Sequence, residues 1–142
     1  MTRLRALAGV LLPLVLAACA APKPGPDILA PTEEQTKVRS YQTRTFDVAE
    51  RQVAMRAVLG VLQDLGFIVE RANEPLGLIT AARFAEPNFS DVVAVTVTVR
   101  AVADGQTMIR LNAIHNNRPV VEPEPYQRFF AALEKSLFLT KG

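Results

Sequence analysis

Valines at every second position between residues 92 and 102 constrain the fold of this chain more than any other feature of its sequence. The valines that would share one face of a strand are Val93, Val95, Val97 and Val99. Thr96, Thr98 and Arg100 would share the opposite face, because successive side chains of a strand point to opposite sides. One apolar and one polar face are typical of an antiparallel sheet that is buried on one side and solvated on the other.

A turn at Asp104-Gly105 should fold the next strand, residues 107–116, back onto the valine strand. A two-residue loop would place Val97 opposite the polar Asn112, whereas a three-residue loop would place it opposite Leu111. The three-residue loop also puts glycine at the position that needs a positive φ. Because a slip of one residue would turn every side chain to the wrong face, we predict the three-residue loop.

Two segments have apolar residues at the spacing of an amphipathic helix, one on each side of the predicted hairpin. Asp47 and Glu50 have the spacing of a capping box, so Asp47 is the expected N-cap of the first helix. The apolar positions of this helix are Val53, Ala54, Ala57, Val58, Val61, Leu62 and Leu65. The second helix should open at Pro123, because proline is tolerated in a first helical turn. Its apolar stripe is Tyr126, Phe129, Phe130, Leu133 and Leu137.

Three further strands are predicted at residues 38–46, 67–71 and 78–84, where residues that favour strands are bounded by turn residues. The expected order of elements is therefore β-α-β-β-β-β-α. Placing both helices on one face of an antiparallel sheet would cover the valines. We expect an α+β fold of this kind as a single domain over residues 38–142.

The amino terminus has the parts of a secretory signal peptide. Arg3 and Arg5 supply positive charge, and an uncharged run follows over residues 6–18. As a helix, these 13 residues would cover about 20 Å, which is too short for a hydrocarbon core of roughly 30 Å. We therefore expect a cleaved leader, residues 1–18, and not a membrane span. Its removal leaves equal numbers of basic and acidic residues, so nothing predicts binding to nucleic acid.

The leader ends in Leu16, Ala17 and Ala18 before Cys19, and this tetrapeptide resembles the lipobox of bacterial lipoproteins. The resemblance implies that a signal peptidase recognises the three residues and that Cys19 carries diacylglycerol and an N-acyl lipid. Membrane lipid would then be the first partner, and no other cofactor is expected. Ala20 implies, by the same resemblance, an outer-membrane location facing the periplasm, with the inner membrane as the alternative. Another alternative is a cleaved signal followed by a free or buried thiol.

Prolines are dense in the segment that follows the cysteine: Pro22, Pro24, Pro26 and Pro31. Proline disfavours helix, cannot fill a sheet ladder and favours extended, semi-rigid chain. We therefore predict a tether over residues 19–37, which would hold the folded domain away from the lipid surface.

The folded part also resembles known lipoproteins. A helix ends in Asp64-Leu65-Gly66-Phe67 before a strand, and Leu76-Gly77-Leu78-Ile79 opens the next strand. This arrangement, over about residues 38–140, is similar to a group of small bacterial lipoproteins of unassigned function. It is more loosely similar to the repeated domains of BamC, a lipoprotein of the outer-membrane barrel-assembly machine. The resemblance implies a shared framework and no catalytic residues, and this chain has one such domain where BamC has two.

Few residues are suited to catalysis or metal binding. The chain has one histidine, His115, and its one cysteine is assigned to lipid, whereas a metal site needs several such ligands at one point. None of Ser40, Ser90 and Ser136 lies in a nucleophile-elbow sequence. We therefore expect no metal, no catalytic residue and no enzymatic activity.

Two functions remain as hypotheses. The first is an interaction module for another component of the cell envelope, which would dock on the polar face formed by Thr96, Thr98, Arg100 and Arg110. The alternative is a binder of a small amphiphile or lipid, held between the sheet and the C-terminal helix. Its pocket would lie at the aromatic residues Tyr126, Phe129 and Phe130.

Overall fold

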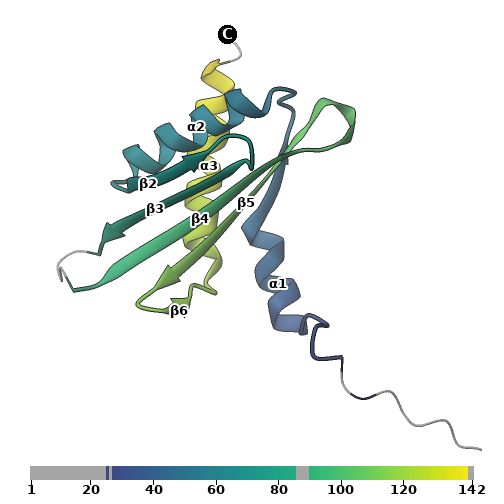
Figure 1. The fold of residues 1–142 in the computed structure, drawn as a ribbon, viewed down its shortest axis with the longest axis vertical. Coiled ribbons are helices and arrows are strands. Elements are labelled where there is room, and N and C mark those ends of the chain that lie inside the picture. The colour runs from purple at the N-terminus through teal and green to yellow at the C-terminus, as the bar shows by residue number, and fades with distance from the viewer. Residues whose placement is uncertain (1–24, 26, 86–89, 141–142) are drawn as a thin grey trace, which may run out of the picture. The chain divides into compact units, whose positions relative to one another are not determined.

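The computed structural model describes residues 25, 27–85 and 90–140. The described helices and strands all belong to residues 31–142, which form one compact unit with an α+β fold. Three α-helices pack with a six-stranded antiparallel sheet (Figure 1). The predicted fold class is confirmed.

The strand order in the sheet is β1-β5-β4-β3-β2. A short strand, β6, pairs with β5 on the same edge as β1, because β4 occupies the whole of the other edge. All strand pairs are antiparallel. The bounds are β1 (Thr43–Phe46), β2 (Ile68–Asn73), β3 (Leu78–Phe84), β4 (Val92–Ala101), β5 (Thr107–His115) and β6 (Arg118–Pro119).

The hairpin of β4 and β5 has the register that the sequence predicts. Val97 lies opposite Leu111, and the loop between the strands covers residues 103–105. Gly105 has a φ of 68°, so glycine occupies a position with positive φ, and Asp104 before it has a φ of 62°. The predicted three-residue loop is therefore confirmed.

Helices α2 (Arg51–Asp64) and α3 (Pro123–Thr140) cover the valine face of the sheet. The buried side chains of α2 are Ala54, Met55, Ala57, Val58, Val61 and Leu62. Those of α3 are Tyr126, Phe129, Phe130, Leu133 and Leu137. These residues form one core with the valines of β4, which confirms both apolar stripes, although Val53 and Leu65 are only half-buried.

The predicted first strand is wrong in its first half, because residues 38–42 belong to a helix, α1 (Glu33–Gln42). A reciprocal capping box starts this helix: the Thr32 hydroxyl accepts the Gln35 N–H, and the Gln35 side chain accepts the Thr32 N–H. The helix also begins inside residues 19–37, the range expected to be tether. The weak strand preference of Tyr41 and its neighbours gives way to this cap and to a first turn that carries two glutamates.

The predicted N-cap at Asp47 is also wrong, because α2 has Glu50 as its N-cap and no side-chain capping bond. Asp47 instead accepts a hydrogen bond from the Gln106 side chain at 2.6 Å. The buried Thr107 hydroxyl donates to the Val48 carbonyl, also at 2.6 Å. These two bonds attach residues 47–48 to the start of β5, so the helix begins one turn later.

Candidate functional site

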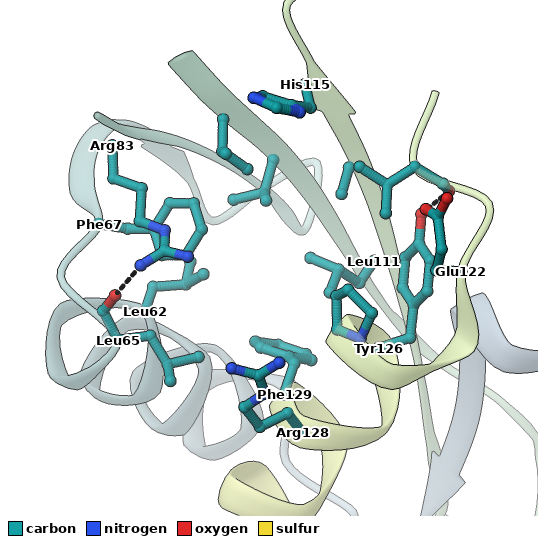
Figure 2. Close-up of a pocket in the computed structure, with 15 residues that line it drawn as sticks. Leu62, Leu65, Phe67, Arg83, Leu111, His115, Glu122, Tyr126, Arg128 and Phe129 are labelled. Atoms are coloured by element: carbon teal, nitrogen blue, oxygen red, sulfur yellow. Dashed lines mark hydrogen bonds between the residues drawn. The ribbon is translucent and has the colours of Figure 1, made fainter. Parts of the chain in front are cut away.

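An apolar cleft opens on the helix-covered side of the sheet, between β4, β5, the end of α2 and the start of α3 (Figure 2). Its volume is about 360 Å³. The strands contribute Val93, Val95, Leu111 and Ala113 to its lining. Leu62 of α2, its C-cap residue Leu65, and Tyr126 and Phe129 of α3 complete the apolar lining. Charged or polar side chains at its mouth are Arg83, His115, Glu122 and Arg128.

The cleft exists because α2 ends before the sheet does. The C-terminus of α2 is closed by a Schellman turn, in which Gly66 N–H bonds the Gln63 carbonyl and Phe67 N–H bonds the Leu62 carbonyl. Beyond this turn no helical residue of α2 remains to cover the end of the valine face. Val97, further along this face, is fully buried. Val93, at the end of the face, is only half-buried as a consequence.

At the cleft mouth, the buried face of the sheet ends in a cross-strand row of three residues, two of which are polar. Arg83 of β3 lies opposite Val93 of β4, and Val93 lies opposite His115 of β5. All three positions share the face that is buried further along the strands. The apolar face therefore ends in an arginine and a histidine, both of which line the cleft.

Tyr126 forms one wall of the cleft and is held on both sides. Its fully buried hydroxyl donates to the Val120 carbonyl at 2.6 Å and accepts from the Gln42 side chain at 3.3 Å. Gln42 also donates to the Asn112 side chain at 3.3 Å. Helix α1, which the sequence did not predict, thus positions a side chain of the site.

Arg83 is fixed at the mouth by two contacts. Its guanidinium lies over the Phe67 ring, 5.1 Å from the ring centroid, which is within the range of a cation–π interaction. Its Nη1 donates to the Leu65 carbonyl at 3.4 Å, the bond drawn in Figure 2. This arginine therefore holds the end of α2 to β3 and presents a cation beside the cleft.

The other polar groups at the mouth come from β5, from the segment before α3 and from α3 itself. His115 Nε2 lies 3.9 Å from Asp91 Oδ2, and the Asn116 side chain donates to Asp91 at 2.6 Å. A carboxylate oxygen of Glu122 accepts the Val121 N–H at 3.2 Å. Arg128 projects from the first turns of α3 and is exposed.

The structure gives these groups no arrangement typical of a catalytic or metal site. Within residues 27–85 and 90–140, no three His, Cys, Asp or Glu side chains gather closely enough to hold a metal ion. The cleft lining contains His115 but no serine, and the Ser40 hydroxyl donates to the Lys37 carbonyl within α1. The arrangement is suited to holding an apolar chain, with polar groups only at the opening.

The aromatic residues named for the amphiphile pocket divide into two groups. Tyr126 and Phe129 line the cleft. Phe130 lies in the core instead. Its ring centroid is 5.2 Å from that of Phe129 and 6.3 Å from that of Phe46. The sequence did not identify Arg83, Phe67 or Arg128 as residues of this site.

The predicted docking surface lies on the opposite face of the sheet. Thr98 lies directly opposite Arg110, and Thr96 and Arg100 flank Thr98 along β4. The two threonines are half-buried and the two arginines exposed. The structure therefore brings the four residues together, and Arg110 also borders a shallow groove beside α1.

The same outer face carries an apolar area that the sequence did not predict. A cross-strand row runs through Ile68, Ala82, Ala94 and Ile114, one residue from each of four strands. Phe84, which is 56% exposed, pairs with Val92 beside this row. The outer face of the sheet is thus polar at one end and apolar at the other.

The residues assigned to lipidation and signal cleavage, Leu16, Ala17, Ala18 and Cys19, lie outside the described residues. In the described part of the chain, no helix is both long and apolar enough to span a bilayer. No protein-family model matches the chain, and no curated protein matches it. The resemblance to lipoproteins and to BamC therefore stays a prediction from the sequence.

Proposed function

We propose that this chain is a non-enzymatic lipoprotein of the outer membrane, anchored through Cys19 and facing the periplasm, whose folded domain binds the apolar chain of an amphiphile. The observation that carries this proposal is the apolar cleft between the sheet and α3. It lies where the sequence hypothesis requires a pocket, at Tyr126 and Phe129. A lipid anchor would keep such a domain close to a supply of amphiphiles.

The size of the cleft supports a single chain as the ligand. Its volume of about 360 Å³ is at the lower end of the range for small-molecule sites, ~300–1,000 Å³. A water molecule occupies about 30 Å³ in the liquid, and a methylene group is of similar size. The cleft therefore has room for about ten carbons in total, which is fewer than two long acyl chains contain.

A series of straight-chain carboxylates tests the proposal. Each methylene buried contributes about 0.8 kcal/mol, which corresponds to about a fourfold gain in affinity. Calorimetric titration with carboxylates of increasing length should show this gain up to about ten carbons and then a plateau. The chain from Ala20 onward is suitable, because the described core residues all lie between Gln42 and Leu137.

Matched variants test whether the ligand binds in the cleft. Ala113→Phe adds a ring to the cleft lining and should abolish binding, and Val93→Phe at the half-buried rim should weaken it. Ala94→Phe adds the same ring on the opposite face of the same hairpin and should leave affinity unchanged. Far-ultraviolet circular dichroism and the melting temperature check that each variant folds. An affinity independent of chain length, or equal losses in the Ala94 and Val93 variants, would contradict the proposal.

The docking hypothesis for Thr96, Thr98, Arg100 and Arg110 stays a prediction. A photoreactive residue at Thr98 should crosslink to one defined envelope protein in intact cells, and the same residue at Gln63 on α2 should not. Identical products from both positions would argue against a specific surface.

A further inference from the structure

We infer that the cleft selects amphiphiles with an anionic head group, a carboxylate or a phosphate, and that Arg83 and Arg128 bind this group. The inference rests on the proposed function, since it concerns the head group of the ligand whose chain fills the cleft. Both arginines line the cleft. Figure 2 shows their guanidinium groups near Leu65, on the side of the cleft where α2 ends.

Arg83 is prepared for this task before any ligand binds. Its guanidinium lies over the Phe67 ring and donates to the Leu65 carbonyl, and these two contacts restrain its position. A guanidinium has five N–H donors, and the bond to Leu65 uses one of them. A planar, pre-positioned arginine loses little conformational entropy on binding and can donate two parallel hydrogen bonds to a carboxylate or phosphate.

Arg128 adds a second cation from a different element. It stands on α3 next to Phe129, whose ring lines the cleft. A ligand whose chain lies against the strands can therefore place its head group between β3 and α3. Two cations from separate elements select for negative charge more strongly than one.

Among the described residues, no acidic side chain forms an ion pair with Arg83 or Arg128. Glu122 is on the other side of the cleft, next to Tyr126 in Figure 2, and its carboxylate accepts the Val121 N–H. Asp91 faces His115 and Asn116. The two guanidinium groups are therefore not paired with a carboxylate, although Asp64 beside Leu65 and Glu124, one helical turn before Arg128, add negative charge nearby.

Four ten-carbon amphiphiles with different head groups test the inference: decanoate, decyl phosphate, decyl maltoside and decyltrimethylammonium. At low ionic strength we expect either anion to bind at least tenfold more tightly than the cation, with the neutral maltoside between them. This preference should shrink as salt is added, because salt screens charges at an exposed site. The comparison of decanoate with decyl phosphate separates a fatty-acid ligand from a phosphate-bearing lipid.

Charge-removing variants assign the preference to the two residues. Arg83→Gln and Arg128→Gln should each reduce it, and the double variant should abolish it while retaining about a fourfold gain per methylene. Arg100→Gln and Arg110→Gln on the outer face, which change the net charge equally, should retain it. Because Arg128 is exposed on the surface of α3, its variant should fold even if the Arg83 variant does not.

The outcomes distinguish the two proposals. Equal binding of all four amphiphiles, with a gain per methylene, overturns the head-group inference and leaves amphiphile binding intact. An equal loss of preference in the outer-face variants also overturns it, since the effect would then come from net charge. Absence of binding by every amphiphile overturns both proposals.

Discussion

Replacing Gly77 by alanine should destabilise the fold more than the same change at Gly66 or Gly60. Gly77 has a φ of 63° and accepts the Val99 N–H at 2.7 Å, where the turn before β3 passes the end of β4. A Cβ atom at this position would overlap the carbonyl oxygen of Val99 and lie 3.2 Å from its carbonyl carbon. Because that neighbour is backbone, the turn and β4 would have to separate.

Most of the cost comes from two contributions, to which any remaining overlap adds. A left-handed conformation costs a residue with a Cβ roughly 1–2 kcal/mol. Separation of the turn from β4 weakens the bond between Val99 and Gly77, a hydrogen bond whose net contribution is about 0.5–1.5 kcal/mol. With the residual overlap, Gly77→Ala should lower the free energy of unfolding by about 3 kcal/mol or more.

Two other glycines provide controls that separate these contributions. Gly66 has a φ of 79° with open space around a would-be Cβ, so Gly66→Ala should cost only the conformational term, about 1–2 kcal/mol. Gly60 lies within α2, also with open space, so Gly60→Ala should stabilise by about 0.8–1 kcal/mol. Equilibrium urea unfolding of the chain from Ala20 onward measures all three. If Gly77→Ala costs no more than Gly66→Ala, the argument from backbone overlap is refuted.

Two further predictions concern the site wall and the anchor. Tyr126→Phe removes the hydroxyl that joins α3 to Val120 and Gln42. It should lower the free energy of unfolding in urea by about 1–3 kcal/mol, because buried polar partners lose their hydrogen bond. An unchanged midpoint would show that these hydrogen bonds do not stabilise the fold. Cys19→Ser should abolish incorporation of labelled palmitate in cells, and a variant that still takes up label would contradict lipidation at this residue.

The sequence predicts the hairpin and both core helices because each depends on a local period. Alternate valines define one face of β4, and the need to pair them with apolar residues of β5 fixes the register. The stripe from Tyr126 to Leu137 defines the inner face of α3 in the same way. In each case the physical driving force is burial of an apolar face, which leaves a repeating pattern in the sequence.

Helix α1 and the start of α2 follow from interactions with no such period. The cap at Thr32 is a pair of local bonds that competes with the strand preference of the following residues. Asp47 has the spacing of an N-cap, but its carboxylate accepts a hydrogen bond from the Gln106 side chain, which is distant in sequence. A tertiary partner thus decides the outcome at a position where local spacing points to another structure.

The cleft itself depends on where α2 ends relative to the sheet, which no local pattern specifies. The sequence nevertheless contains a signal for its mouth: along β3 and β5, polar Arg83 and His115 occupy the register positions that continue the buried face. Burying a cation without a partner is costly, so such a residue marks the point where the apolar face stops being covered. The same row of residues therefore marks both the limit of the core and the rim of the site. This row explains why an apolar cleft and a cationic side chain coincide here, since Arg83 needs solvent access and Val93 beside it is left half-buried.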